Sequence, residues 1–186
     1  FEGVLAFDDA RTGKRPAVMI AHAWAGRSQM EIDFARRIAA MGHAGFALDL
    51  YGKGVLGAGS EENQRLMTPF IEDRAMLAGR LSHILSVVRT LPEVDSRRIA
   101  IIGFCFGGLC ALDLARSGAD IAGAASFHGL LGAPAKAGTR KIRARIIMFH
   151  GWDDPMATPA DVLAVTRELT VAGADWQLHA YGGVKH

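Results

Sequence analysis

The sequence feature that most constrains this chain is a cysteine set among glycines, in the stretch Gly103-Phe104-Cys105-Phe106-Gly107-Gly108. The apolar run before it, residues 99–102, predicts a buried strand, and residues 109–116 predict a helix. A strand, a sharp turn and a helix with a nucleophile at the turn form a nucleophile elbow, whose usual pattern is G-x-S-x-G. Gly103 and Gly107 lack the Cβ atoms that would collide in so tight a turn, so the elbow can hold the cysteine sulfur above the sheet.

Two other interpretations of this stretch compete with the elbow. The first is a glycine-rich strand-to-helix turn around a structural thiol, because free cysteine often behaves as a small hydrophobic residue. The second is a phosphate-binding loop, which is disfavoured because no Gly-Lys-Ser/Thr sequence follows and the G-x-G-x-x-G spacing is absent. Whether Cys105 has a catalytic or a structural role therefore has to be judged from the residues that follow it in the sequence.

Apolar strands alternate with amphipathic helices along the whole chain. Strands are predicted at residues 1–7, 17–21, 45–48, 99–102, 121–127, 146–149 and 176–181, and a loop at residues 130–140. Helices are predicted at residues 30–41, 61–91, 109–116 and 158–172, the second of them in two pieces that restart at Thr68 and Pro69. This order predicts an α/β fold, with a doubly wound, mostly parallel sheet in a three-layer α/β/α arrangement.

Length, charge and cysteine content narrow the classes of protein further. The chain has 186 residues and a formal net charge of +2, which suits a single domain over residues 1–186. The sequence has no Lys/Arg cluster with interleaved aromatic residues, so nucleic-acid binding is not expected. No apolar run reaches the ~18 residues of a membrane span, so no membrane partner is expected either. The two cysteines, Cys105 and Cys110, are too close along one helix to form a disulfide framework, so a cytoplasmic protein is expected. We further expect a monomer or a homodimer. Because Phe1 begins within a predicted strand and His186 ends in a loop, the chain is expected to be truncated at both ends.

Three residue types of a nucleophilic triad follow one another in the order nucleophile, acid, base that doubly wound hydrolases use. Cys105 follows one predicted strand, Asp153 and Asp154 follow another, and His186 follows the last. Asp154 is the predicted acid, whereas Asp153 is expected to form the turn or to face solvent. The structural alternatives are an Asx-turn before Pro155 and a solvent-exposed loop histidine at the end of the chain.

Acyl transfer also needs N–H donors for the developing oxyanion. The backbone N–H of Phe106 is one candidate, and that of Trp24, after the strand at residues 17–21, is the second. The side chains of Trp24, Arg80 and His128 are candidates for the substrate pocket. Alternatively, Trp24 packs within its loop, Arg80 lies on a solvated helix face, and His128 is a structural histidine. The histidines and cysteines lack H-x-x-x-H or C-x-x-C spacing, so no metal and no other cofactor is expected.

The chain resembles the dienelactone hydrolase family of α/β-hydrolases over nearly its whole length. The resemblance rests on five motifs, Asp49-Leu50-Tyr51-Gly52, Gly103-Phe104-Cys105-Phe106-Gly107-Gly108, Phe127-His128-Gly129, His150-Gly151-Trp152-Asp153-Asp154-Pro155 and Tyr181-Gly182-Gly183-Val184-Lys185-His186. It implies a Cys-Asp-His triad on Cys105, Asp154 and His186, with oxyanion donors on the backbone of Phe106 and Trp24. The implied activity is hydrolysis of a small ester or lactone through a thioester intermediate.

The chain departs from this family at Ala23. Enzymes of the chlorocatechol pathway carry a glutamate at the matching position, and that glutamate contacts the resting cysteine. The resemblance therefore implies the hydrolase class and the triad more firmly than the substrate. Two alternatives stay open, which are a broad carboxylesterase for uncharged esters and a non-catalytic or thiol-sensing ligand-binding member of the fold.

The chemistry expected at Cys105 depends on the pKa of its thiol, because the thiolate is the attacking form. A free cysteine has a pKa of about 8.5. The helix N-terminus and His186 are both expected to lower the pKa of Cys105 from that value.

Overall fold

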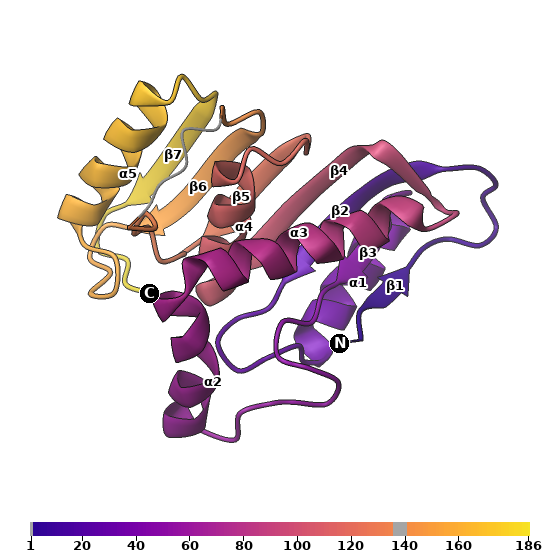
Figure 1. The fold of residues 1–186 in the computed structure, drawn as a ribbon, viewed down its shortest axis with the longest axis horizontal. Coiled ribbons are helices and arrows are strands. Elements are labelled where there is room, and N and C mark those ends of the chain that lie inside the picture. Colours follow the sequence, from indigo (N-terminus) through magenta and orange to yellow (C-terminus); the bar gives the residue numbers. More distant parts are fainter. Residues whose placement is uncertain (1, 136–140) are drawn as a thin grey trace.

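Seven apolar segments of the sequence pair into one sheet in the computed structural model, which describes residues 2–135 and 141–186 (Figure 1). The strands are β1 (Val4–Ala6), β2 (Arg15–Ala21), β3 (Ala44–Ala47), β4 (Val94–Phe104), β5 (Gly123–Phe127), β6 (Arg145–Gly151) and β7 (Trp176–Tyr181). The helices are α1 (Gln29–Ala40), α2 (Ser60–Glu72), α3 (Arg74–Thr90), α4 (Phe106–Arg116) and α5 (Pro159–Val171). The α/β fold with a mostly parallel sheet is confirmed; the predicted loop at residues 130–140 falls partly outside the described residues.

The strand order across the sheet, β1-β3-β2-β4-β5-β6-β7, fixes where a ligand can bind. All pairs are parallel except β1 with β3, which is antiparallel. The chain moves from β2 outward to β3 and then returns to lay β4 on the other side of β2. The order therefore reverses between β2 and β4, and in open α/β sheets ligands bind at such a switch point, beyond the carboxyl ends of the strands.

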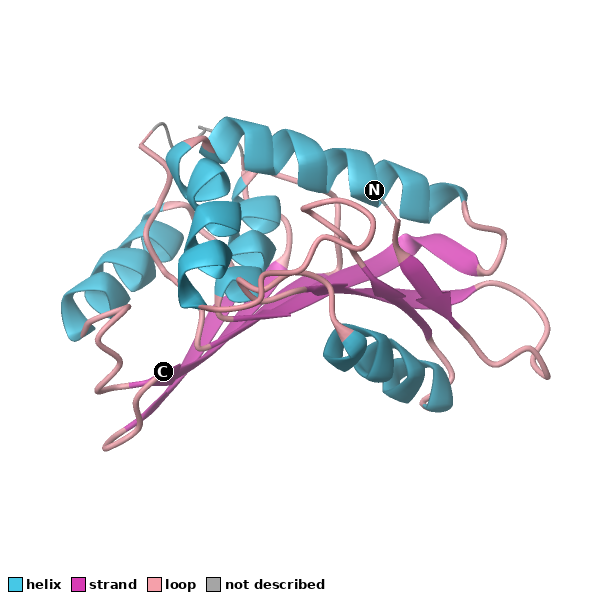
Figure 2. Ribbon diagram, turned by 90° about the horizontal axis from the view of Figure 1, so that it is seen from below, coloured by secondary structure: helices cyan, strands magenta, loops and turns pink. Residues whose placement is uncertain are grey.

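The helices divide unequally between the two faces of the sheet. Figure 2 shows the sheet nearly edge-on, with helices on both faces. Side chains of α1 pack with Ile20, Ala47 and Ile102 in a small cluster, whereas α3, α4 and α5 contribute to the large core on the opposite face. Within the described residues α1 is thus the only helix of its layer.

An aromatic ladder crosses four strands on the face that carries α1. Phe104, Phe127, Phe149 and His179 are in register on β4, β5, β6 and β7. Their ring centroids lie 4.8, 5.0 and 5.3 Å apart in that order, and Phe34 of α1 contacts the first ring at 4.9 Å. Stacked rings at these spacings stabilise the sheet beyond the burial of their area.

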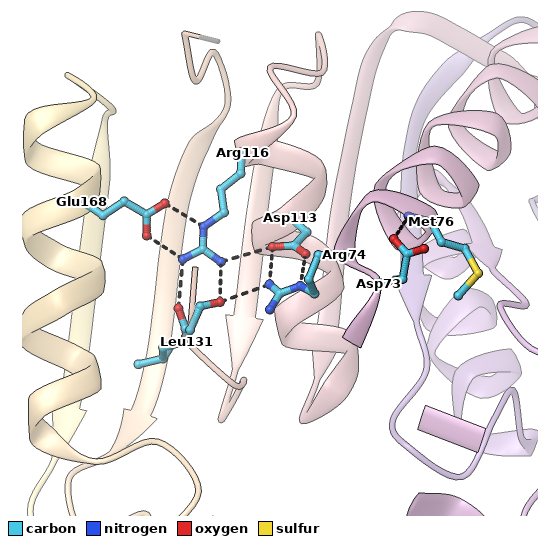
Figure 3. Close-up of polar contacts among 8 residues, drawn as sticks. Asp73, Arg74, Met76, Asp113, Arg116, Leu131 and Glu168 are labelled. Carbon is cyan, nitrogen blue, oxygen red and sulfur yellow. Dashed lines mark hydrogen bonds and ion pairs between the residues drawn. The ribbon is translucent and has the colours of Figure 1, made fainter. Parts of the chain in front are cut away.

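The break between α2 and α3 lies at Asp73, so the predicted restart at Thr68 and Pro69 is wrong. Pro69 stands inside the last turn of α2, where its missing N–H costs one hydrogen bond close to the helix end. Asp73 instead leaves the helical conformation, and its carboxylate accepts the backbone N–H of Met76 at 2.8 Å, which caps α3 (Figure 3).

Helix α4 is buried along its whole length, and charged side chains anchor its far end (Figure 3). Asp113 accepts two hydrogen bonds of 2.6 Å from Arg74 of α3 and one of 3.2 Å from Arg116. Arg116 also forms a bidentate pair with Glu168 of α5, at 2.9 and 2.7 Å, and donates to the carbonyl of Leu131 at 2.9 Å. This ion cluster (Arg74, Asp113, Arg116 and Glu168) joins α3, α4 and α5.

Candidate active site

The elbow predicted from the glycines is present at the start of α4. Cys105 connects β4 to α4 with φ 54° and ψ −119°, a conformation that is strained for any residue with a side chain. A Cβ atom on Gly103 would lie 2.0 Å from the carbonyl oxygen of Gly107, and one on Gly107 would lie 2.2 Å from that of Ala21. Both contacts are with backbone atoms, so both positions require glycine.

The thiol of Cys105 is nearly completely buried, and two backbone amides are directed at it. The N–H groups of Phe106 and Trp24 both hydrogen-bond to its sulfur. Burial raises the pKa of the Cys105 thiol by more than these two bonds lower it, and the charge of Asp154 raises it further. The expectation of a lowered thiol pKa is therefore wrong, because burial outweighs the hydrogen bonds from the two amides.

His186 and Asp154 form a hydrogen-bonded pair, with 2.7 Å between Nδ1 and Oδ2. Asp154 is 1 % exposed, and its other oxygen accepts the backbone N–H of Met156 at 2.8 Å. Burial raises the pKa of Asp154, but the hydrogen bonds from Met156 and His186 lower it by more, so the net pKa lies below its usual value. The neighbouring Asp153 is exposed, and its backbone N–H donates to the carbonyl of Val184. An ionised Asp154 keeps a proton on Nδ1 of His186 and leaves Nε2 to accept another.

His128, which follows β5, contacts the other nitrogen of the same imidazole. Its Nδ1 lies 3.3 Å from Nε2 of His186, and the two rings meet edge to face with centroids 4.6 Å apart. His128 has φ 38°, a second strained position beside Cys105. Burial and the neighbouring His186 lower the pKa of His128, so the ring is neutral at neutral pH. The sequence indicated a pocket residue here but not a contact with His186.

The loop after β2 is held by two side chains, those of His22 and Tyr51, to which the sequence analysis assigned no role. His22 is fully buried, with Nδ1 2.6 Å from the carbonyl oxygen of Ala23 and Nε2 accepting the backbone N–H of Leu50 at 3.2 Å. The hydroxyl of Tyr51 donates to the carbonyl of Trp24 at 3.0 Å. A polar side chain that directly follows an apolar strand was the only sequence signal for His22.

Two of the pocket candidates, Arg80 and the side chain of Trp24, pack against other parts of the fold. Arg80 donates to the carbonyl of Leu50, and its guanidinium lies 4.9 Å from the ring centroid of Phe70. The Phe70 ring in turn contacts that of Phe106, with 6.1 Å between the two ring centroids. Arg80 lines a cavity of about 490 Å³ together with Asp49, Met76 and His83. The Trp24 side chain is partly buried against the large core.

Taken together, the strand ends bring a thiol, an imidazole–carboxylate pair and two N–H donors to one edge of the sheet, an arrangement suited to nucleophilic acyl transfer. Among the described residues, no three His, Cys, Asp or Glu side chains are grouped so as to hold a metal ion. In the same part of the chain, no helix combines the length and the apolar character that a membrane crossing needs.

Comparison with known proteins points to one family. A sequence profile of the dienelactone hydrolase family matches residues 1–186. A dienelactone hydrolase-like promiscuous phosphotriesterase from metagenomic libraries is 32 % identical, with a TM-score of 0.92 over 99 % of this chain and 77 % of that one. A structure named m3DLH is 37 % identical, with the same TM-score and coverage. A candidate carboxymethylenebutenolidase of Synechocystis sp. is 25 % identical over 99 % of this chain and 79 % of its own length.

Proposed function

Because the chain belongs to the dienelactone hydrolase family, we propose that it hydrolyses a small ester or lactone with Cys105 as the nucleophile and His186 and Asp154 as base and acid. The observation that carries this proposal is the elbow itself. A cysteine in a strained conformation presents its sulfur to two backbone N–H groups, those of Phe106 and Trp24. Such donors have little purpose beside a structural thiol, whereas a tetrahedral oxyanion next to the sulfur needs them.

The first half of the reaction forms a thioester. Nε2 of His186 exchanges its contact with His128 for the thiol, takes the proton of Cys105, and becomes an imidazolium that Asp154 stabilises. The sulfur attacks the carbonyl carbon, and the carbonyl oxygen becomes an oxyanion that accepts the N–H groups of Phe106 and Trp24. When the oxyanion collapses, the bond from carbon to the alcohol oxygen breaks, and His186 returns its proton to the leaving alkoxide.

The second half clears the enzyme. A water molecule gives a proton to Nε2 of His186 and attacks the thioester carbonyl, and the two amides again hold the oxyanion. The carbon–sulfur bond then breaks, the proton returns from His186 to the sulfur, and the carboxylic acid leaves. Because the pKa of Cys105 is raised, the thiol is a neutral resting group and loses its proton only during turnover.

The substrate class is proposed from the neighbourhood of the sulfur. Ala23 offers no carboxylate beside Cys105, and the guanidinium of Arg80 is engaged by the Leu50 carbonyl and the Phe70 ring. These features support small uncharged esters and lactones over substrates that carry a carboxylate. A series that pairs each ester with its carboxylated analogue would separate the two classes.

Aryl phosphate triesters are a second candidate class. The observation that favours them is the 32 % identity, over 99 % of this chain, to a phosphotriesterase of the dienelactone hydrolase type. The sulfur would attack phosphorus, the phosphoryl oxygen would take the two amides, and the aryloxide would leave with the proton from His186. Water would then cleave the phosphorus–sulfur bond.

Steady-state hydrolysis of p-nitrophenyl acetate, a dienelactone and an aryl dialkyl phosphate tests these assignments. Wild type should turn over at least the acetate, and Cys105→Ala should be inactive. Cys110→Ala is the matched control, because Cys110 is the other cysteine of the chain and is buried inside α4, one turn beyond the elbow. Mass spectrometry of the quenched reaction should find an acyl group on Cys105. An active Cys105→Ala enzyme would overturn the proposal, whereas inactive wild type with reversible oxidation of Cys105 would favour the thiol-sensing alternative.

A further inference from the structure

A buried histidine lies behind one of the two amides that face the sulfur. The ring of His22 is 0 % exposed, and its Nδ1 lies 2.6 Å from the carbonyl oxygen of Ala23. That oxygen belongs to the peptide group whose N–H is the N–H of Trp24. A peptide group is planar and trans, so its C=O and N–H point in opposite directions. Fixing the direction of the Ala23 carbonyl therefore fixes the direction of the Trp24 N–H.

The second ring nitrogen of His22 determines which tautomer is present. Nε2 faces the backbone N–H of Leu50 at 3.2 Å, and an N–H can only donate. Nε2 must accept, so the ring is neutral and its proton is on Nδ1, where it donates to Ala23. Burial lowers the pKa of His22 and favours this neutral form, although the carboxylates of Glu31 and Asp49 act in the opposite direction and Arg27 acts with it. The backbone N–H of Gly26 donates to the same Ala23 carbonyl at 3.2 Å.

The peptide group on the other side of Trp24 is held as well. The Tyr51 hydroxyl donates to the carbonyl of Trp24 at 3.0 Å, and the Tyr51 ring meets the His22 ring edge to face at 4.6 Å. Leu50 and Tyr51 both follow β3, the strand next to β2. Both peptide groups of Trp24 are therefore held before any substrate arrives, one by His22, whose ring is itself bonded to Leu50, and the other by Tyr51.

We propose that His22 and Tyr51 are positioning residues that set the direction of the Trp24 N–H as an oxyanion donor. The inference rests on the proposed function, in which this N–H stabilises the oxyanion. A donor held in place in advance needs no reorganisation as negative charge develops, which is the condition under which such donors lower a barrier most. Hydrogen bonds to the Ala23 carbonyl also polarise the peptide group and strengthen its N–H as a donor.

Two substitutions of His22 separate its two hydrogen bonds. In His22→Asn, the side-chain amide replaces the Nδ1 side of the ring and can still donate to Ala23, but the acceptor for Leu50 is lost. In His22→Gln, the amide reaches the Nε2 side and can still accept from Leu50, but the donor to Ala23 is lost. Each variant removes one hydrogen bond and part of a buried ring, so a merely structural histidine predicts similar losses of activity in both.

The positioning role predicts a split between the two variants. We expect kcat of His22→Asn on p-nitrophenyl acetate to stay within about fivefold of wild type. We expect His22→Gln to lose about tenfold to a hundredfold in kcat with little change in KM, which is less than the ~10²–10³ lost when an oxyanion donor is removed outright. Because the same N–H stabilises the thiolate, the pKa of Cys105, measured from the pH dependence of iodoacetamide alkylation, should rise in His22→Gln and stay unchanged in His22→Asn.

Tyr51→Phe is a second variant that keeps the ring and removes only the hydroxyl. It should lower kcat several-fold and raise the alkylation pKa in the same direction as His22→Gln, and it decides the question if neither His22 variant folds. Equal kcat losses in the two His22 variants, or an unchanged kcat and alkylation pKa in Tyr51→Phe, would overturn the positioning role. Failure of the proposed function looks different, because Cys105→Ala would then be as active as wild type, or wild type itself would be inactive.

Discussion

Asp113 is the acceptor on which a buried arginine and a half-buried one converge, and its removal should destabilise the protein strongly. Its carboxylate is 3 % exposed and pairs with Arg74 and Arg116, whose side chains are 14 % and 7 % exposed. Removing one partner from a buried ion pair costs about 3–5 kcal/mol, because the opposite charge stays buried without compensation. Arg116 keeps its pair with Glu168, and Arg74 borders a cavity of about 460 Å³ that water can enter. Both facts favour the lower end, about 3 kcal/mol for Asp113→Ala.

The measurement is urea unfolding followed by circular dichroism, with thermal unfolding beside it. For a chain of this size, 1 kcal/mol corresponds to about 2–4 °C, so Tm should fall by about 6–12 °C. Asp33→Ala is the control, because Asp33 also accepts from an arginine, Arg36, at 3.0 Å, but in an exposed pair on α1. It should leave the urea midpoint essentially unchanged. If Asp113→Ala also left the midpoint where it is in wild type, the ion cluster would not be the anchor of α4.

Three further predictions concern the elbow and its histidines. Gly107→Ala should abolish esterase activity and lower Tm, because the added Cβ would lie 2.2 Å from a backbone oxygen of β2. The control Gly79→Ala, in an open position of α3, should instead raise the free energy of unfolding by about 0.5–1 kcal/mol. Equal effects of the two substitutions would refute the steric argument. Burial lowers the pKa of His22 and His128, so the unfolded chain binds protons at higher pH than the folded one, and the free energy of unfolding should fall as the pH drops from about 7 to 5. His22→Asn should flatten this slope in urea titrations at several pH values, and a wild-type slope of opposite sign would contradict the reasoning. His128→Phe removes the contact to Nε2 of His186 and should speed alkylation of the thiol at neutral pH; slower alkylation would assign the reverse role to His128.

The alternation of strands and helices and the elbow could be predicted because their causes are local. Gly103 is required by the carbonyl of Gly107, four residues along the chain, so its cause lies within the turn itself. Gly107 also meets Ala21 of β2, a contact that the G-x-C-x-G pattern contains without showing it. The break at Asp73 was not predicted, because Thr68 and Pro69 give a strong helix-start signal that a helix already under way can override near its end.

The pKa of Cys105 and the role of His22 could not be predicted for a different reason. Both depend on groups that lie far away in the sequence, namely the core that buries the thiol and the strand that brings Leu50 and Tyr51 beside the loop after β2. Charge and helix position predict a lowered pKa for Cys105, and only the packed structure reveals that desolvation is larger. Likewise, Asp113 and Arg116 look like an ordinary pair along one helix until Arg74 and Glu168 meet them from other helices.

Because of the switch in strand order between β2 and β4, we expect the proposed active site to be completed late in folding. Ala17 pairs with Ile99 and Ala21 with Gly103, so the two strands that carry the loop of Trp24 and the elbow are joined by a long stretch of chain. Closing so long a loop costs entropy before its contacts form, and non-local pairings of this kind fold slowly. The imidazole of the proposed triad belongs to His186, which follows β7, and among the described strands β7 pairs only with β6. Recovery of activity after dilution from urea is therefore expected to lag behind the recovery of helix signal, and to report the completed sheet.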